Sequence, residues 1–224
     1  MTELLDFHAH ILPRADHGSS SVDTSLCQIS MARQSGVSCI LATPHFYPAE
    51  EGVSRFLERR ERAYNRLCGE LGDNLPNIIL AAEVLICDNI ESLPDIDALC
   101  IAGTNTLLLE LPFNYFDKRF KVSVDTLIKR GMNVVLAHAD RYDKENIDSL
   151  IEIGAKIQLN ASALGSFFAK KHLYDWIDQG VVVGLGSDIH HADKKAYKNF
   201  RTAIRKIGSE RTEKIMRAAW QILN

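Results

Sequence analysis

One unit recurs along this chain: a segment with helical spacing, then a glycine, then a short apolar run. Four glycines follow helix-like stretches in this way, at Gly36, Gly131, Gly154 and Gly180. A glycine just past a helix end adopts the left-handed conformation that closes the last turn and releases the chain into a strand. Repetition of this unit predicts a parallel sheet covered by helices, as a closed barrel or as an open sheet.

Several apolar runs have the length and composition of buried strands. They cover residues 4–7, 37–42, 78–82, 106–109, 134–137, 155–159 and 181–185. Helical spacing is found over 56–71, and residues 210–223 are expected to form a terminal helix. No glycine-rich phosphate loop follows any of the runs, which favours a barrel over an open nucleotide-binding sheet. The 224 residues show no linker or shift of composition, so we expect one domain over 1–224.

Charge, hydropathy and cysteine usage narrow the classes of partner. A formal net charge of −3 argues against broad electrostatic binding to nucleic acid or to an anionic membrane. No apolar run approaches the roughly 18 residues needed to cross a bilayer, and the N-terminus lacks the pattern of a secretory signal. The five cysteines are widely spaced and never form a Cys-x-x-Cys pair, which is typical of reduced thiols. We therefore expect a cytoplasmic protein with no membrane span and no nucleic-acid partner.

Polar side chains with metal-binding chemistry appear where each predicted strand ends. They are His8 and His10, His45, Glu83, Glu110, His138, Asn160, and Asp188 with His190. In a parallel barrel the carboxyl ends of all strands open on one face, so these residues should converge. Burying so many imidazoles and carboxylates together is costly unless cations compensate them. The pattern predicts a polynuclear metal site.

The ligand types narrow the choice of metal. His8 and His10 are two residues apart on an extended strand, so both imidazoles can reach one ion. Imidazole and carboxylate without thiolate suit Mn, Fe or Zn, and there are enough ligands for about two or three ions. Glu83, near the middle of the strand order, is the candidate bridging ligand. Closely spaced ions produce a hydroxide nucleophile and hold both the attacking and the leaving oxygen of a phosphoryl displacement.

The motifs together resemble those of a known family. They are DFHAHILPRADHG from Asp6, ATPH ending at His45, AEV around Glu83, ELP from Glu110, AHADRY containing His138 and Arg141, NA from Asn160, and SDIH containing Asp188 and His190. In this order they resemble the bacterial PHP-superfamily protein-tyrosine phosphatases associated with capsular and exopolysaccharide synthesis. The resemblance spans nearly the whole chain.

The resemblance implies a fold and an activity. The fold is a distorted (β/α)7 TIM-like barrel with a trinuclear metal centre, often containing Mn. The activity is hydrolysis of phosphotyrosine on a protein by a metal-activated hydroxide. The implied partner is a bacterial tyrosine kinase of the same polysaccharide pathway, and a homo-oligomer is left open.

The resemblance also assigns roles to individual residues. The implied metal ligands are His8, His10, Glu83 and Asp188 for one ion, Glu83, Glu110 and His138 for a second, and His17, His45 and His190 for a third. Arg141 is expected to bind the phosphoryl group, since a guanidinium fork suits phosphate oxygens. Arg141, Asp188 and His190 are the expected catalytic residues.

Two positions depart from the family pattern. The family has two consecutive aspartates where this chain has Asp16 and His17, so the expected ligand at position 17 is an imidazole, with Asp16 as the alternative. A second phosphate-binding arginine is replaced around Lys194 and Lys195. We expect Lys195 to contact the substrate, although lysine keeps the charge without the bidentate geometry.

Four other functions compete with this interpretation. A small-molecule phosphatase of the histidinol-phosphate type would use the same fold and the same metals. An amidohydrolase usually places a metal-bridging lysine at a middle strand end, where this chain has Glu83 and Glu110. A non-catalytic, metal-stabilised binding module would not need Arg141. Cleavage of nucleic-acid phosphoesters is disfavoured because no basic groove with interleaved aromatic residues is visible.

Overall fold

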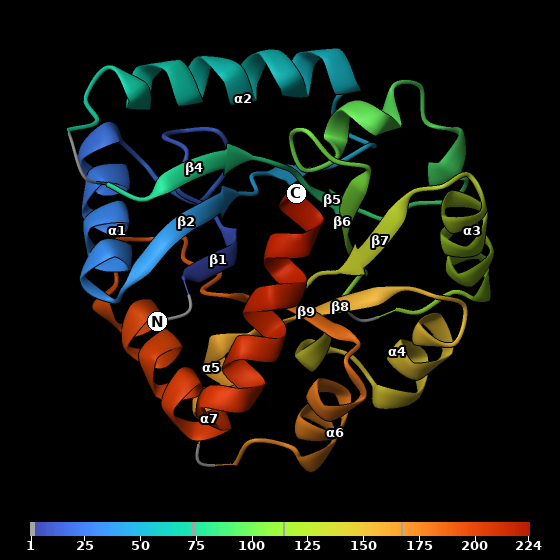
Figure 1. The fold of residues 1–224 in the computed structure, drawn as a ribbon. Helices are drawn as coiled ribbons and strands as arrows, with labels where there is room; N and C mark the ends of the chain where they lie inside the picture. The colour runs from blue at the N-terminus through green and yellow to red at the C-terminus, as the bar shows by residue number, and fades with distance from the viewer. Residues whose placement is uncertain (1–2, 73–74, 114, 167) are drawn as a thin grey trace.

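The computed structural model describes residues 3–72, 75–113, 115–166 and 168–224. Its strands lie in the middle of the molecule and its helices on the outside (Figure 1). The strands are β1 (Leu4–Ala9), β2 (Val37–Ala42), β3 (His45–Phe46), β4 (Asn77–Leu80), β5 (Glu83–Leu85), β6 (Thr106–Glu110), β7 (Asn133–Leu136), β8 (Lys156–Asn160) and β9 (Val182–Gly186). The α-helices are α1 (Val22–Gln34), α2 (Val53–Cys68), α3 (Lys118–Lys129), α4 (Lys144–Ile151), α5 (Ala161–Gly165), α6 (Lys171–Gln179) and α7 (Lys194–Leu223). Short 3₁₀ turns cover Ile90–Ser92, Ile96–Leu99 and Ala139–Arg141.

All strand pairs among the described residues are parallel. Neighbouring strands are consecutive in the sequence except where β2 pairs with β4 and β3 pairs with β5. The strands pair as two sheets, in the orders β1-β2-β4 and β3-β5-β6-β7-β8-β9. Backbone hydrogen bonds continue across the break between the sheets, from Ala81 N to Ala42 O (2.9 Å) and from Glu83 N to Pro44 O (3.1 Å). The mixed α/β fold with parallel strands is therefore confirmed, with its strands divided between two sheets.

Each predicted strand is present, but two short strands were not predicted. The predicted run 78–82 corresponds to β4, which ends at Leu80, and β5 begins separately at Glu83. β3 has only two residues and follows Pro44, which has no N–H to continue the ladder from β2. Strands this short carry no periodic signal. These two strands matter because they hold His45 and Glu83, which are their first residues.

The glycines predicted to close helices do so. Gly180 follows α6 with φ of 76°, and Gly36, Gly131 and Gly154 also have positive φ values. The predicted boundaries are less accurate: α2 covers 53–68 rather than 56–71. The terminal helix was predicted over 210–223, whereas α7 starts at Lys194 and is interrupted at Gly208, where φ is 83°.

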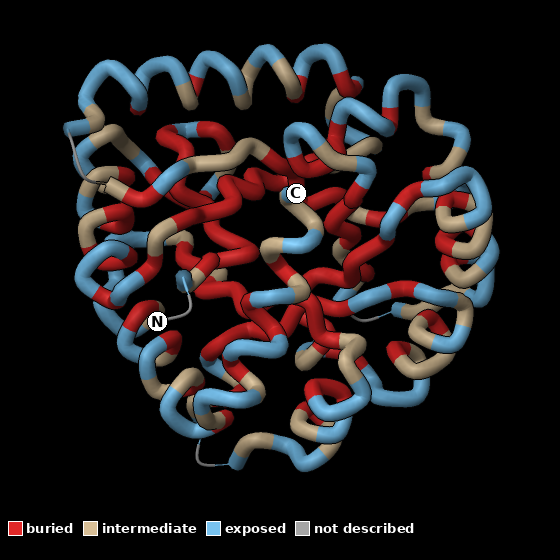
Figure 2. Tube along the Cα trace, in the orientation of Figure 1, coloured by how far each residue is buried: buried red, intermediate tan, exposed pale blue. Residues whose placement is uncertain are grey.

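The buried residues lie on the strands and on the inner faces of the helices (Figure 2). Strand β9 packs so closely on its neighbours that it needs glycine. A Cβ atom on Gly184 would lie 2.4 Å from Cγ of Phe7, and one on Gly186 would lie 2.4 Å from Nε2 of Gln158 and 2.7 Å from Cβ of His8. These glycines let β1 and β8 approach β9, which sets the position of His8. In the described part of the chain, no helix combines the length and apolar character that a membrane span requires.

Candidate metal centre

Glu83 is the hub of a buried cluster of histidines at the carboxyl ends of the strands. Its Oε2 atom lies 3.1 Å from Nε2 of His8, 3.2 Å from Nε2 of His10 and 3.0 Å from Nδ1 of His45. Its Oε1 atom lies 2.7 Å from Nε2 of His138. All five side chains are buried. The structure thus places Glu83 among four imidazoles, as a bridging carboxylate requires.

Two further carboxylates flank this hub. Glu110 Oε1 lies 3.5 Å from Nε2 of His138, and Glu110 Oε2 lies 3.7 Å from Nδ1 of His45. On the other side, Asp188 Oδ1 lies 3.5 Å from Nε2 of His10 and 3.7 Å from Nε2 of His8. Residues from β1, β3, β5, β6 and the segments after β7 and β9 therefore meet, as the strand-end pattern predicted.

Three sets of donor atoms are compact enough to surround an ion, with all atoms of a set within 4.8 Å of one another. The sets are His8, His10 and Asp188; His45, Glu83 and Glu110; and His10, His45 and His190. The first matches three of the four ligands implied for one ion. The second contains His45 where His138 was implied, and the third contains His10 where His17 was implied.

Hydrogen bonds outside the cluster fix the tautomers of His8 and His10. Nδ1 of His8 lies 3.1 Å from Oε1 of Gln158, and Nδ1 of His10 lies 2.7 Å from Oδ2 of Asp16. The same Gln158 oxygen accepts the backbone N–H of His138 at 2.6 Å, so this atom is the acceptor end of the amide. Both Nδ1 atoms must therefore donate. The Nε2 atoms lie 3.0 Å apart, so in the neutral rings their lone pairs would face each other.

The rings of His138 and His190 are oriented in the same way. The hydroxyl of Tyr142 donates to the carbonyl oxygen of Leu111 (2.8 Å), so it accepts from Nδ1 of His138 at 3.2 Å. Nδ1 of His190 donates to the carbonyl oxygen of Asp188 at 3.1 Å. Each Nε2 is left as a lone pair that faces the cluster. Outer partners of this kind are typical of metal-ligating histidines.

The donor set fits divalent cations. Imidazole lone pairs and carboxylate oxygens face one another at about 3 Å, an arrangement that is repulsive without positive charge between them. Nδ1 of His45 and Oε2 of Glu83 are buried and lie 3.0 Å apart, but within the described residues neither atom has a partner with hydrogen-bonding geometry. The cluster can thus hold divalent metal ions, whose charge would satisfy these atoms.

Without such ions, protons take the place of the missing charge. Burial lowers the pKa of His138, but hydrogen bonds to Glu110 and Glu83 outweigh burial and raise this pKa to about 9. Burial raises the pKa of Glu83, but the surrounding histidines reverse this and hold it well below its usual range. Burial alone would also raise the pKa of Asp188, but contacts with His10 and His8 hold this pKa below its usual range. The carboxylates of Glu83 and Asp188 are therefore ionised and can bind a metal ion.

His17 lies beside His45 and His190, the two residues implied to share an ion with it, and Asp16 contacts other atoms of the cluster. His17 is exposed at the rim, where its ring stacks on His45 with 4.6 Å between centroids. Asp16 accepts hydrogen bonds from His10 Nδ1 and from the backbone N–H of His45 at 3.0 Å. Within the described residues, none of the three compact donor sets includes either side chain. Asp16 orients two ligands, and the ligand role of His17 stays a prediction.

The two predicted substrate-binding cations border the cluster. The Arg141 guanidinium forms an ion pair with Oδ2 of Asp188, and its side chain is 34% exposed. Lys195 is exposed in the first turn of α7 and lines a cleft of about 270 Å³ together with Asp188 and His190. Asn160 also reaches Asp188, donating from Nδ2 to Oδ2 at 3.1 Å.

Sequence reasoning missed Gln158, Tyr142 and Asp6. Gln158 lies two residues before Asn160 on β8, so strand alternation places both on one face, a signal that could have been used. Tyr142 lies inside the AHADRY motif. Asp6 is fully buried and accepts from the Ser187 N–H and the Tyr197 hydroxyl, both at 2.8 Å. Asp6 thereby braces β1 against the segment that carries Asp188.

Replacing Gln158 with leucine is expected to weaken Mn²⁺ binding about 10- to 100-fold, the usual effect of removing an outer partner of a metal ligand. The variant removes the acceptor that orients His8 and holds the backbone of His138. Gln28→Leu is the matched control, because Gln28 is a buried glutamine on α1 whose side-chain amide has no hydrogen-bond partner among the described residues. Calorimetric Mn²⁺ titration gives both affinities. Equal affinities in the two variants would contradict the role given to Gln158.

The sequence is similar to a known protein family and to a known phosphatase. The family model for capsular polysaccharide synthesis proteins, CpsB/CapC, matches residues 4–224. Tyrosine-protein phosphatase YwqE of Bacillus subtilis (strain 168) is 26% identical over 213 residues, which cover 89% of this chain and 81% of that protein.

Solved structures agree on the fold. A structure from a study of YwqE from Bacillus subtilis and CpsB from Streptococcus pneumoniae, described as unique metal-dependent tyrosine phosphatases, matches with a TM-score of 0.78 and 22% identity. That match covers 98% of this chain and 94% of the other. Ochratoxinase of A. niger matches more distantly, with a TM-score of 0.50 and 16% identity over 97% of this chain and 70% of the other. Because the family model spans nearly the whole sequence, the chain belongs to the CpsB/CapC family of capsular polysaccharide synthesis proteins.

Proposed function

We propose that this chain is a metal-dependent phosphatase that hydrolyses phosphotyrosine on a protein, and that this protein is a tyrosine kinase of a capsular or exopolysaccharide pathway. The observation that carries the proposal is the buried carboxylate of Glu83 among four imidazoles, with the guanidinium of Arg141 at the mouth of the cluster. Family membership and the likeness to YwqE, a tyrosine-protein phosphatase, support it.

We assign the metal ligands by the donor atoms that face the cluster. They are His8, His10, His45, Glu83, Glu110, His138, Asp188 and His190, with His17 available from the rim. This set suits about two or three ions, most simply Mn, with Fe or Zn as alternatives. When bound, such ions activate water as a nucleophile and stabilise negative charge on the phosphoryl oxygens.

The protein's own side chains position the ester. Arg141 has five N–H donors, and its ion pair with Asp188 holds the guanidinium at the edge of the cluster, where its remaining donors can bind phosphoryl oxygens. Lys195 supplies a second positive charge from α7. Asp188 contacts Arg141 as well as the buried His8 and His10. His190 stacks on His10 and lines the same cleft as Lys195. A tyrosine phenolate, whose conjugate acid has a pKa near 10, leaves with little help from an acid, so water or a group of the site suffices.

We also propose that the two sheets are parts of one distorted (β/α)7 barrel in a single domain over 1–224. Hydrogen bonds from Asp188 N to His8 O (2.9 Å) and from His10 N to Ile189 O (3.0 Å) support this, because they join β1 to the segment after β9.

A cytoplasmic place of action is supported by the cysteines, all five of which are free thiols.

The proposal is tested by metal analysis of the purified protein together with a phosphotyrosyl-peptide assay. We expect bound divalent metal, hydrolysis of the peptide, loss of both after chelation, and recovery on addition of Mn²⁺. Histidinol phosphate is the comparison substrate, and preferential turnover of it would favour the small-molecule alternative. A metal-loaded protein that is inert towards both phosphoesters would overturn the phosphatase proposal and favour a binding module.

A further inference from the structure

A cleft of about 220 Å³ adjoins the metal centre on the side of Glu110. Its lining includes Phe113, Tyr115 and Phe116 from the segment after β6, and Arg141 and Tyr142 from the segment after β7. The volume is below the roughly 300–1,000 Å³ of sites that enclose drug-sized ligands, so the cleft suits one side chain. The metal chemistry does not account for its aromatic residues.

The cleft shares residues with the metal centre. The hydroxyl of Tyr142 contacts both Nδ1 of the ligand His138 and the carbonyl oxygen of Leu111, the residue that follows Glu110. Arg141 is paired with Asp188 on its other side. A phosphoryl group on Arg141 would therefore project its ester substituent towards the aromatic residues.

The aromatic wall is exposed to solvent and yet held in place. The described residues with exposed large apolar side chains are Phe113 (68%), Tyr115 (52%), Val122 (63%) and Phe168 (85%). Two of the four belong to this cleft. Tyr115 is anchored, because its hydroxyl donates to Asp117 at 2.6 Å and its ring meets the edge of Phe120 at 5.6 Å. Exposed aromatic side chains beside a charged site, with Tyr115 anchored among them, indicate a surface that is covered by a ligand.

Another cleft, of about 370 Å³, borders the cluster, and its lining includes Asp16, His17 and His45. It is less suited to an aromatic ring. Its lining also includes Glu50 and Glu51, and Glu51 is already paired with Arg59. That cleft has one aromatic side chain, Tyr47, and its two arginines are matched by the two glutamates. The cleft at Phe113 has four aromatic side chains and one carboxylate, Asp143, beside the cation of Arg141.

We propose that the cleft at Phe113 receives the aromatic ring of the phosphorylated residue while Arg141 holds its phosphoryl group, and that Phe113 determines the preference for aryl over alkyl phosphate esters. This inference rests on the proposed phosphatase function and names a residue that selects its substrate class. Contact between aromatic rings favours an aryl ester, while a short alkyl ester leaves the wall exposed.

The test compares two phosphonates that the enzyme cannot hydrolyse as esters, phenylphosphonate and methylphosphonate. Calorimetry with the Mn²⁺-loaded protein is expected to show about tenfold tighter binding of phenylphosphonate. Phe113→Ser should abolish most of this difference and leave the methylphosphonate affinity unchanged. Phe113→Tyr keeps the ring and should keep the difference. Val122→Ser is the matched control, because Val122 is an equally exposed apolar residue on α3.

The outcomes separate this inference from the phosphatase proposal. If Phe113→Ser retains the tenfold difference, or if the unmodified protein binds both phosphonates equally, the role of Phe113 is overturned, while hydrolysis of a phosphotyrosyl peptide would still support the function. If the metal-loaded protein binds neither phosphonate and hydrolyses no peptide, both proposals fail together.

Discussion

Replacement of Glu83 with glutamine is expected to lower metal affinity by more than about 100-fold and to abolish phosphatase activity. Even partners outside the ligand set are worth about 10- to 100-fold in metal affinity, and Glu83 touches four imidazoles directly. Glutamine keeps the shape of the side chain and removes its charge. Metal analysis after dialysis against trace Mn²⁺ measures the loss.

The same variant separates loss of metal from loss of fold. In the metal-free protein the ionised Glu83 carboxylate helps to raise the pKa of His138 to about 9, so removing its charge should lower the unfolding temperature of the metal-free variant below that of the metal-free parent. Added Mn²⁺ should raise the unfolding temperature of the parent and leave that of Glu83→Gln unchanged, because only a bound ligand stabilises the fold. Glu61→Gln, at an exposed glutamate on α2, is the control. Normal metal content in Glu83→Gln would contradict the bridging role.

Residues on regular strands were the most predictable part of the site. The two-residue spacing of His8 on β1 and His10 just past its end was enough to place both imidazoles in one cluster. The central position of Glu83 in the strand order likewise predicted its place among the histidines. Alternation along a strand and a shared sheet edge are properties that a sequence pattern carries directly.

Residues in the loops were less predictable. Asp16 and His17 are adjacent, and only the path of the loop decides that Asp16 points inwards while His17 stays at the rim. The family resemblance implied His17 as a metal ligand, with Asp16 as the alternative. The strands β3 and β5 escaped notice because two or three residues have no period. Gln158 was missed since an uncharged amide gives no sign of metal chemistry until its partners are known.

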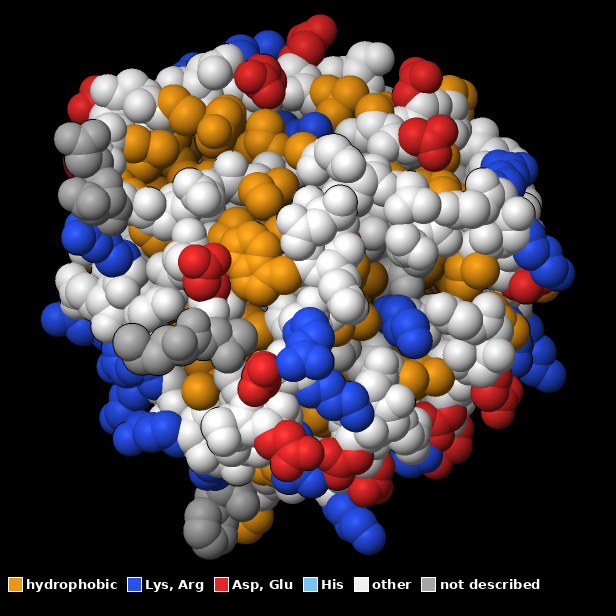
Figure 3. Space-filling view, viewed as in Figure 1, with side chains coloured by type: hydrophobic (Ala, Val, Ile, Leu, Met, Phe, Trp, Pro, Cys, Tyr) orange, Lys and Arg blue, Asp and Glu red, His pale blue; other side chains and the backbone are white. Residues whose placement is uncertain are grey.

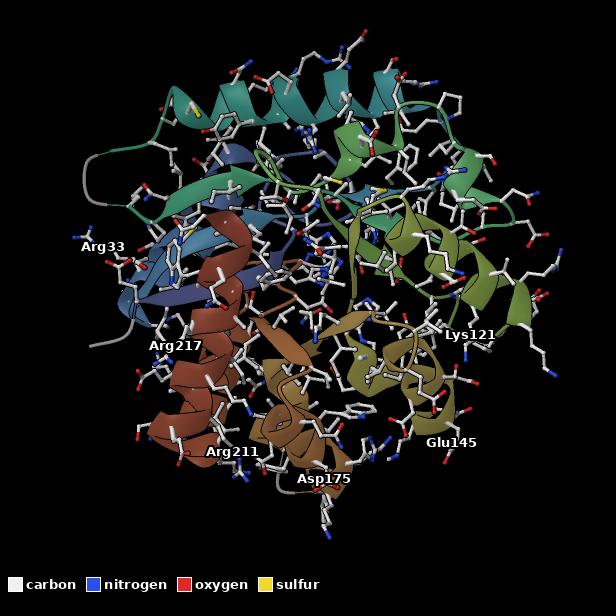
Figure 4. All side chains as sticks on the ribbon, turned by 45° about the vertical axis from the view of Figure 1, so that its right-hand side comes forward. Arg33, Lys121, Glu145, Asp175, Arg211 and Arg217 are labelled. Atoms are coloured by element: carbon white, nitrogen blue, oxygen red, sulfur yellow. The ribbon has the colours of Figure 1, made fainter. Side chains whose placement is uncertain are left out.

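The chain has many exposed arginines, and Arg141 differs from Arg211 in the surroundings of its aspartate partner. On the face shown in Figure 3, basic and acidic side chains are interspersed. Arg211 and Arg217 lie at the periphery in Figure 4, together with other labelled charged residues. Arg211 pairs with Asp178 through two contacts of 2.7 and 2.6 Å. Arg141 forms a similar arginine–aspartate pair, but its partner Asp188 is 6% exposed and contacts His8 and His10.

Replacement of Arg141 with alanine is therefore expected to lower kcat/KM for a phosphotyrosyl peptide by about 10- to 100-fold, the effect of losing about 1.5–3 kcal/mol of charge-assisted hydrogen bonding. Metal content should remain normal, because Asp188 loses a competing cation and keeps its contacts with the histidines. Arg141→Lys should recover only part of the loss, since an ammonium group lacks the guanidinium fork. Steady-state kinetics on metal-verified protein measure both effects.

The control for this change is Arg211→Ala, which breaks an arginine–aspartate pair between α7 and α6, away from the metal centre. It should leave kcat/KM unchanged, so a decrease confined to the Arg141 variants reports on the substrate rather than on the loss of a positive charge. A decrease that is accompanied by loss of metal would mean that Arg141 supports the ligands through Asp188 instead of binding the phosphoryl group. Unchanged kinetics in Arg141→Ala would remove this residue from the site, and with it the reason for placing the ester beside Phe113.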